Sequence, residues 1–155
     1  MNKEELMMRA CQLAEESVRQ EGGPFGAVIA RNGEIIAEGS NCVTIHHDPT
    51  AHAEVTAIRK VTKALATHNL SGCEIYTSCE PCPMCLGAIY WAHLDKIYYG
   101  NNREDAAKIG FDDDFIYKEI ELKPELRSLP SEILMQEKAM EAFKMWAEKE
   151  DKAEY

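Results

Sequence analysis

The sequence predicts an α/β protein in which helices cover a mixed β-sheet. The N-terminal segment has apolar residues at helical spacing, and two strand-like runs joined by Asn32-Gly33 follow it. Beyond this hairpin, strand-like and helix-like segments alternate, which is typical of a mixed sheet with covering helices. The 155 residues are 45% hydrophobic and 28% charged, so one domain with a buried core is expected, spanning residues 1–155.

The first predicted helix begins at a capping box and ends at a glycine-rich turn. Asn2 followed by Glu5 resembles a capping box, and the segment GGPFG, residues 22–26, ends the helix. One apolar stripe along this helix is expected to face the core: Met7, Ala10, Ala14 and Val18, with Leu6 and Leu13 beside it. Strands follow at residues 27–30 and 35–38, because Asn-Gly between two apolar runs is a strong hairpin signal.

The middle of the chain alternates between helix and strand. Asp48-Pro49 is expected to be the N-cap and first residue of a helix that runs to about Leu65. A strand at 74–77, a helix at 81–91 and a strand at 96–99 come next. Residues 103–108 are predicted to form a short helix, and residues 131–135 a last strand. The acidic and aromatic run at 110–120 is given no predicted structure. A final helix carries one more apolar stripe: Met140, Phe143 and Ala147, with Trp146 nearby.

Composition limits the partners of the chain. No apolar run approaches the roughly 18 residues of a membrane span, and the N-terminus lacks the pattern of a secretory signal. We therefore expect a cytoplasmic protein whose thiols stay reduced. The formal net charge is −10 and the pI is about 5.0, which disfavours nucleic acid and favours a small neutral substrate.

The stretch SCEPCPMC, residues 78–85, indicates a metal site. Cys82 and Cys85 are three residues apart, so on the first turn of a helix both thiols lie on one face. The positive end of the helix favours thiolates there, and Pro81 and Pro83 suit a helix start. A disulfide is disfavoured in a reducing compartment, and an iron–sulfur cluster lacks its fourth cysteine.

The segment HAE, residues 52–54, supplies the missing parts of a catalytic zinc site. His52 is the expected third ligand, and Glu54 is placed to reach a water molecule on the metal. A structural zinc with Cys79 as its fourth ligand remains an alternative. The other cysteines are expected to be small buried residues: Cys11, Cys42 and Cys73.

The motif H-x-E followed by P-C-x-x-C is the signature of zinc-dependent nucleoside and nucleobase deaminases. The sequence resembles this cytidine deaminase superfamily over GGPFGAV, Asn41, DPTAHAEV and YTSCEPCPMCLGAIYWA. The resemblance implies a cytidine-deaminase-like three-layer α/β/α sandwich, one Zn²⁺ per chain and hydrolytic release of ammonia. The run AAKIGFDDDFIYKEI and the C-terminal Tyr155 are similar to the small bacterial guanine deaminases within it.

Residue roles follow from the resemblance. It implies that His52, Cys82 and Cys85 hold zinc and that Glu54 carries protons. In the guanine-specific branch Asp113 lies near the exocyclic amine, with Asp112 and Asp114 as competitors for this role. The expected substrate contacts are Asn41 on the base edge, Phe25 on the ring, Trp91 as a wall of the pocket and Tyr155 as a lid.

The predicted reaction is the hydrolysis of guanine, a small purine base, to xanthine and ammonia. Deamination of tRNA adenosine or of cytosine remains an alternative, and so does a non-catalytic zinc-bearing ligand-binding module. Retention of Glu54 argues against the last, because a glutamate that is not a ligand has no structural duty at the metal. The resemblance also implies a homodimer in which residues 101–155 are exchanged, so that Asp113 and Tyr155 would complete the partner's pocket.

Overall fold

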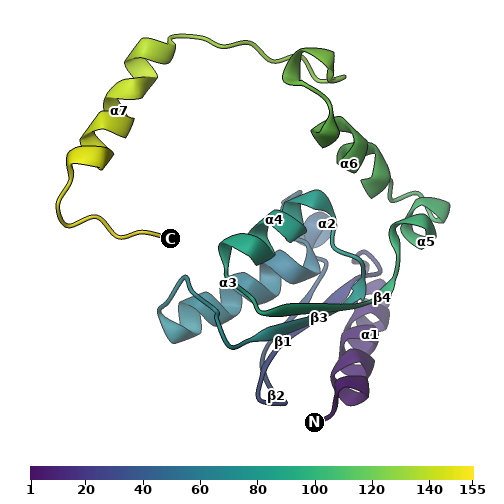
Figure 1. Ribbon diagram of the computed structural model, residues 1–155. Helices are drawn as coiled ribbons and strands as arrows, with labels where there is room; N and C mark the ends of the chain where they lie inside the picture. Colours follow the sequence, from purple (N-terminus) through teal and green to yellow (C-terminus); the bar gives the residue numbers. More distant parts are fainter. The chain divides into compact units, whose positions relative to one another are not determined.

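A four-stranded mixed sheet forms the centre of the first 117 residues (Figure 1). The computed structural model describes residues 1–155 and divides them into two units, Met1–Tyr117 and Lys118–Tyr155. The strand order is β2-β1-β3-β4, with β1 antiparallel to β2 and β3, and β3 parallel to β4. The strands are β1 (Gly26–Arg31), β2 (Glu34–Ser40), β3 (Glu74–Cys79) and β4 (Lys96–Asn101).

Helices cover both faces of this sheet, which confirms the predicted α/β/α sandwich (Figure 1). On one face, α1 (Lys3–Arg19) packs Leu6 and Ala10 against Val28 and Tyr76 of the sheet. On the other face, α3 (Ala53–Leu65) and α4 (Pro83–Trp91) enclose a second apolar cluster. Because successive strand residues point to opposite faces, β1 contributes to both clusters and is buried on both sides.

The hairpin and the first helix start as the sequence predicts. Arg31 pairs with Glu34 across the turn, and Asn32 and Gly33 have φ values of 51° and 76°, the left-handed geometry of a two-residue hairpin turn. Asn2 and Glu5 form the predicted capping box. The strands extend beyond the predicted ranges at most ends.

Two predictions about helices were wrong in detail. The buried side of α1 contains Leu6, Ala10, Leu13 and Ser17, whereas Val18 is 53% exposed because it lies about 100° further round the helix. Asp48 does not cap the long helix. Its carboxylate accepts the backbone N–H and hydroxyl of Thr50, which closes a local turn after α2 (Val43–His46). As a result α3 begins after His52 instead.

The later part of the first unit contains the site-bearing helices. Cys82 is the N-cap of α4, so this helix begins two residues later than predicted. The prediction of α5 (Arg103–Lys108) is confirmed, and Asn102 caps it through a second capping box. The acidic run, which had no assigned structure, forms α6 (Asp113–Glu121).

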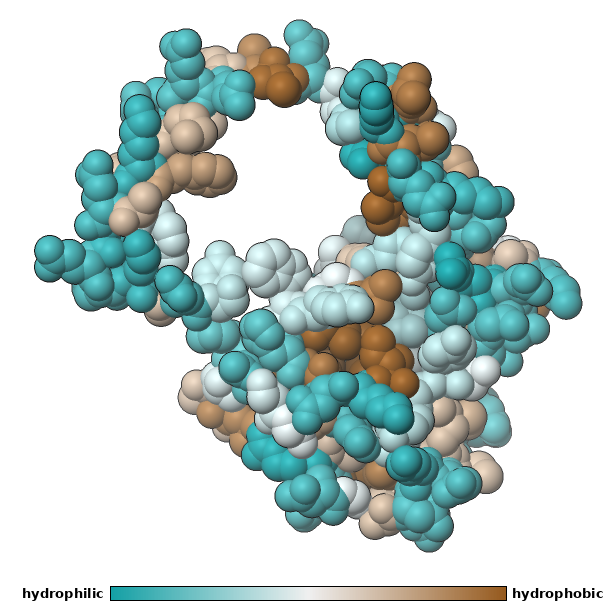
Figure 2. Space-filling view, in the orientation of Figure 1, coloured by the Kyte–Doolittle hydropathy of each residue, from teal (hydrophilic) through white to brown (hydrophobic).

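The second unit contains no buried side chain. It holds the end of α6, a 3₁₀ turn η1 (Pro124–Leu126) and α7 (Gln136–Glu148), which confirms the final predicted helix. The predicted strand at 131–135 is wrong, since no other strand pairs with these residues. Figure 2 shows hydrophobic residues on α6 and in the segment before α7. None of the helices in the chain has both the length and the apolar character that a membrane span needs.

Candidate metal centre and substrate cavity

Two helix N-termini bring the three predicted metal ligands together. His52 is the N-cap of α3, Cys82 is the N-cap of α4, and Cys85 lies on the first turn of α4. The Nδ1 atom of His52 is 3.5 Å from the Sγ atoms of both Cys82 and Cys85. All three ligand atoms lie within 4.8 Å of one another, and both thiols are buried.

The chemistry of these donors fits Zn²⁺. Two ligands that bind one tetrahedral zinc at about 2.1 and 2.3 Å lie about 3.6 Å apart, close to the observed separation. The pKa of Cys82 is lowered to about 4, because the Cys85 thiol and then the His52 imidazole hydrogen-bond to its thiolate. A buried thiolate among neutral donors is a site for a cation.

Cys79 does not join this group. It ends β3, and its thiol points to the backbone oxygen of Asn102 at 3.8 Å. Burial raises the pKa of Cys79 to about 12, so it remains a neutral thiol. The geometry therefore favours a three-ligand site over a four-ligand structural site that includes Cys79. The three remaining cysteines were expected to be buried. Cys73 is buried, whereas Cys11 and Cys42 are partly exposed.

Glu54 lies beside the metal ligands on the first turn of α3 and is only 5% exposed. His52 has extended backbone angles, because it caps the helix and is not part of its interior. If both residues were in a helix interior, the side chains of His52 and Glu54 would point in different directions, because they are two residues apart. The cap geometry of His52 instead lets both side chains face one point. The hydroxyl of Thr77 donates to Glu54 Oε1 at 2.7 Å and holds the carboxylate in place.

A cavity of about 220 Å³ opens next to the metal ligands. It joins Phe25, Asn41 and Asp113, which the sequence predicts as substrate contacts, with His52, Glu54 and Cys82. Sequence reasoning did not identify the other residues that line the cavity: Gly23, Val43, Thr44, Glu80 and Phe111. Apolar rings and a few polar groups around a concave space are typical of a small-molecule site.

Among the three consecutive aspartates, Asp113 is the one that lines the cavity. Asp112 accepts the backbone N–H of Phe115 at 3.2 Å, and Asp114 lies 4.0 Å from Arg103. The pKa of Asp113 is raised to about 6, first because burial disfavours the carboxylate and then because the Cys82 thiolate is near. This carboxyl group therefore exchanges a proton more readily near neutral pH than an ordinary aspartate.

Asp113 lines the cavity of its own chain. Exchange of residues 101–155 between subunits stays a prediction. The segment from Asn102 to Tyr117 packs onto its own unit. The Phe111 and Phe25 rings meet edge to face at 4.9 Å, and Arg103 Nε is 3.0 Å from Glu80 Oε2.

Asn41 follows β2 and is 6% exposed. Its Oδ1 accepts the backbone N–H of Val43 at 3.1 Å, which leaves the amide N–H₂ group to donate to a ligand. The Ser17 hydroxyl lies 2.7 Å from the backbone oxygen of Gly23 and 3.3 Å from that of Asn41. Ser17, which the sequence analysis missed, thus ties α1 to the loop beside the cavity.

The two remaining predicted contacts lie outside the cavity lining. Trp91 is the last residue of α4, is 65% exposed and is not among the residues that line this cavity, so its role as a wall stays a prediction. Tyr155 belongs to the second unit and is 73% exposed. Its role as a lid stays a prediction.

Comparisons with known proteins agree with this site. The family model for the cytidine and deoxycytidylate deaminase zinc-binding region matches residues 1–101. Guanine deaminase from Bacillus subtilis is 53% identical over 156 residues, which is 100% of both chains. A tRNA-specific adenosine deaminase from Aquifex aeolicus is 38% identical over 99 residues, or 64% of this chain and 66% of that protein.

Solved structures show the same similarity. The X-ray structure of the Bacillus subtilis guanine deaminase superposes with a TM-score of 0.96 at 52% identity, covering 100% of this chain and 99% of that one. A guanine deaminase from Nitrosomonas europaea has a TM-score of 0.70 at 34% identity, covering 72% and 65% of the two chains.

Proposed function

The chain belongs to the cytidine and deoxycytidylate deaminase family of zinc-binding proteins, and from this membership we propose that it is a zinc-dependent guanine deaminase. It hydrolyses guanine to xanthine and ammonia. The observation that carries the choice of guanine is the 53% identity to a guanine deaminase along the whole chain. The match to the tRNA-specific adenosine deaminase covers only 64% of the chain.

We propose that His52, Cys82 and Cys85 hold the zinc and that Glu54 moves the first proton. When bound, the zinc ion makes a hydroxide nucleophile available near neutral pH. The Glu54 carboxylate, fixed by Thr77, takes a proton from the attacking water and delivers it to N3 of guanine. As the C2–O bond forms and the C2–N bond breaks, the amino group leaves as ammonia.

Asp113 is our proposed second proton carrier. Its raised pKa, about 6, suits a group that gives a proton to the departing amine and takes one back from the new C2 hydroxyl, which becomes the C2 carbonyl of xanthine. Asn41 donates to the acceptor edge of the base, where guanine carries O6 and N7. Phe25 and Phe111 supply apolar surface against the ring.

A substrate screen tests this function. Purified zinc-loaded protein is mixed with guanine, adenine, cytosine, their nucleosides and an anticodon stem-loop, and ammonia release is measured. We expect ammonia and xanthine from guanine and little reaction with the RNA. Inosine formation in the stem-loop together with no reaction on guanine would overturn the assignment.

The same assay distinguishes an enzyme from a zinc-bearing binding module. Glu54→Gln preserves the shape of the side chain but removes its basicity. We expect this variant to keep about one zinc per chain and to lose kcat by roughly 10²- to 10⁴-fold. A variant with normal turnover would remove Glu54 from the reaction.

We also propose a homodimer in which the second unit is exchanged between subunits, beginning after Tyr117. The support lies within the second unit, which buries none of its side chains. Five of its apolar residues are at least 72% exposed: Leu129, Ile133, Leu134, Phe143 and Met145. An apolar surface of this kind is stabilised by packing against another chain.

We place the enzyme in the cytoplasm, where thiolate metal ligands stay reduced.

A further inference from the structure

Arg103, the first residue of α5, makes contacts at the rim of the cavity that the proposed reaction does not use. Its Nε lies 3.0 Å from Glu80 Oε2, and its backbone N–H donates to Glu80 Oε1 at 3.2 Å. Its guanidinium carbon is 4.1 Å from the centroid of the Tyr117 ring, within the range of a cation–π contact. Its Nη1 is 4.0 Å from Asp114 Oδ1.

The two partners of Arg103, Tyr117 and Glu80, are themselves bonded close to the metal ligands. The Tyr117 hydroxyl donates to the backbone oxygen of Pro81 at 2.5 Å, and Pro81 directly precedes the ligand Cys82. Glu80, which lines the cavity, donates its backbone N–H to the Asn101 oxygen at 2.7 Å. Arg103 therefore stands between the loop that leads into Cys82 and the first turns of α6.

Asp113 is the first residue of α6, the helix that these contacts reach. Its carboxylate makes no hydrogen bond with another group of the chain, so its position is set by the backbone of α6. The helix is held on one side of Asp113 by the Arg103–Asp114 contact and, one turn further on, by the stacking of Arg103 on Tyr117. Residues 113 and 117 lie on one face of the helix, because four residues make about one turn.

We infer that Arg103 is a positioning residue that fixes the Asp113 carboxylate relative to the metal ligands. It acts through Glu80 and Tyr117 and does not itself touch the substrate. The inference rests on the proposed function in one respect, namely that Asp113 takes part in the reaction on guanine. A displacement of about 1 Å in a reacting group can cost about 10²-fold in rate, so a residue of this kind has a measurable kinetic effect.

A double-mutant cycle with Arg103→Ala and Asp113→Ala tests the inference through kcat and KM for guanine and through zinc content. We expect Arg103→Ala alone to lower kcat roughly 10- to 100-fold, to change KM less, and to keep about one zinc per chain. In the Asp113→Ala background the same substitution is expected to have little further effect, because the two changes remove one function. Independent, multiplying losses would overturn the inference, and so would full activity in either single variant.

A second readout does not depend on activity. Hydrogen exchange, followed by mass spectrometry, is expected to be faster in α6 when Arg103 is replaced by Ala and unchanged in α3. Arg19→Ala is the matched control, since Arg19 also pairs with a glutamate, at 3.1 Å, but lies on α1. Unchanged exchange in α6 of an active enzyme would overturn the positioning role alone, whereas a wild-type protein that does not react with guanine would overturn the proposed function.

Two milder variants keep the test open if Arg103→Ala does not fold. Arg103→Lys retains a positive charge near Glu80 but loses the planar stack on Tyr117. Tyr117→Phe retains the ring and loses the bond to Pro81. Both are expected to lower kcat by less than Arg103→Ala, and again only while Asp113 is present.

Discussion

Two carboxylates share the cavity in different environments, and this difference fits the two roles that we propose for them. Glu54 is buried and accepts a hydrogen bond from Thr77, so its direction is fixed. Asp113 is half-buried, and its pKa is raised to about 6 mainly by loss of solvent. The proposed reaction moves protons at two places. A carboxylate with a fixed direction and a second one that titrates near neutral pH suit these two steps.

Removing single thiols tests the metal ligands. Cys82→Ala is expected to abolish zinc binding and activity together, because only two of the three protein ligands of the metal then remain. Cys79→Ala is the matched control, since Cys79 is also buried but its thiol points to Asn102. Zinc is measured by atomic absorption on the purified proteins. Loss of zinc from Cys79→Ala with retention in Cys82→Ala would reverse the assignment.

A methyl group at Gly23 is expected to disturb Asn41. A Cβ atom there would lie 3.0 Å from Asn41 Cγ and 3.3 Å from its Nδ2, so the amide must shift by a few tenths of an ångström. We expect Gly23→Ala to raise KM for guanine roughly tenfold, the equivalent of about 1.4 kcal/mol of binding, and to change kcat less. Gly87→Ala is the control, because a Cβ atom there meets nothing within 4 Å. An unchanged KM would argue that Asn41 does not read the base.

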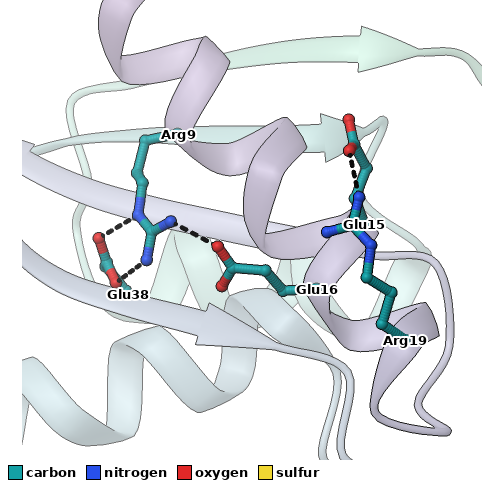
Figure 3. Close-up of polar contacts among 5 residues, drawn as sticks. All are labelled: Arg9, Glu15, Glu16, Arg19 and Glu38. Carbon is teal, nitrogen blue, oxygen red and sulfur yellow. Dashed lines mark hydrogen bonds and ion pairs between the residues drawn. The ribbon is translucent and has the colours of Figure 1, made fainter.

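At the scale of secondary-structure elements, one arginine fastens α1 to the edge of the sheet (Figure 3). Arg9 donates to both carboxylate oxygens of Glu38 on β2, at 2.7 and 2.9 Å, and to Glu16 at 3.0 Å. The hydrogen bond from Arg9 lowers the pKa of Glu38, and the paired carboxylate raises that of Arg9. The pair is bidentate and partly shielded, which makes it stronger than an ordinary surface ion pair.

This pair predicts a pH dependence of stability. Because the pKa of Glu38 is lower in the folded protein than its ordinary 4.5, the stabilisation is complete above about that pH and is lost as pH falls through the folded value. Glu38→Gln is therefore expected to unfold about 1 kcal/mol more easily at pH 7, after allowance for solvent screening, and to differ little from wild type at low pH. Urea unfolding at several pH values measures this. A difference that grows toward low pH would contradict the ion-pair explanation.

Local sequence signals predicted those elements whose ends are fixed by nearby residues. The capping box at Asn2 and the turn at Asn32-Gly33 each act within a few residues and were correct. Asp48 misled because its carboxylate had a closer partner in Thr50. The strand at 131–135 was wrong because strand formation needs a neighbouring strand, which a local pattern does not reveal.

The residues of the site also differ in whether local sequence signals predict them. His52, Cys82 and Cys85 could be predicted as a metal-binding group because their motif has fixed spacing and chemistry, and the structure brings them together. The same motif predicts Glu54 beside them, and Glu54 lines the adjacent cavity. Thr77 and Ser17 were missed because their partners are distant in the sequence. Thr77 is 23 residues from Glu54, and Ser17 is 24 residues from Asn41. Only the folded chain brings such pairs together, and neither residue type indicates its role by itself.

For the whole molecule, mixing inactive variants tests the proposed exchange of the second unit. Glu54→Gln protein is combined, under conditions of subunit exchange, with a variant that lacks Tyr155. If Tyr155 completes the partner's cavity, one cavity of each mixed dimer is intact and ammonia release returns in part. The outcome that contradicts exchange is a mixture as inactive as its components, provided that mixed dimers are shown to form.

The pairing of Glu54→Gln with Asp113→Ala serves as the control for this experiment. Both residues lie in the same unit of the same chain, so each cavity of a mixed dimer keeps one lesion. No recovery is expected. Recovery here would instead place Asp113 in the partner's cavity.

The division of the chain at Tyr117 also has a consequence for how such proteins diverge. Every residue that lines the cavity or binds the metal lies in the first unit. Substitutions after Tyr117 therefore leave the ligand set and the cavity lining of the first unit unchanged. Among the residues of the tail, only those that reach a cavity, as we propose for Tyr155, are tied to the chemistry.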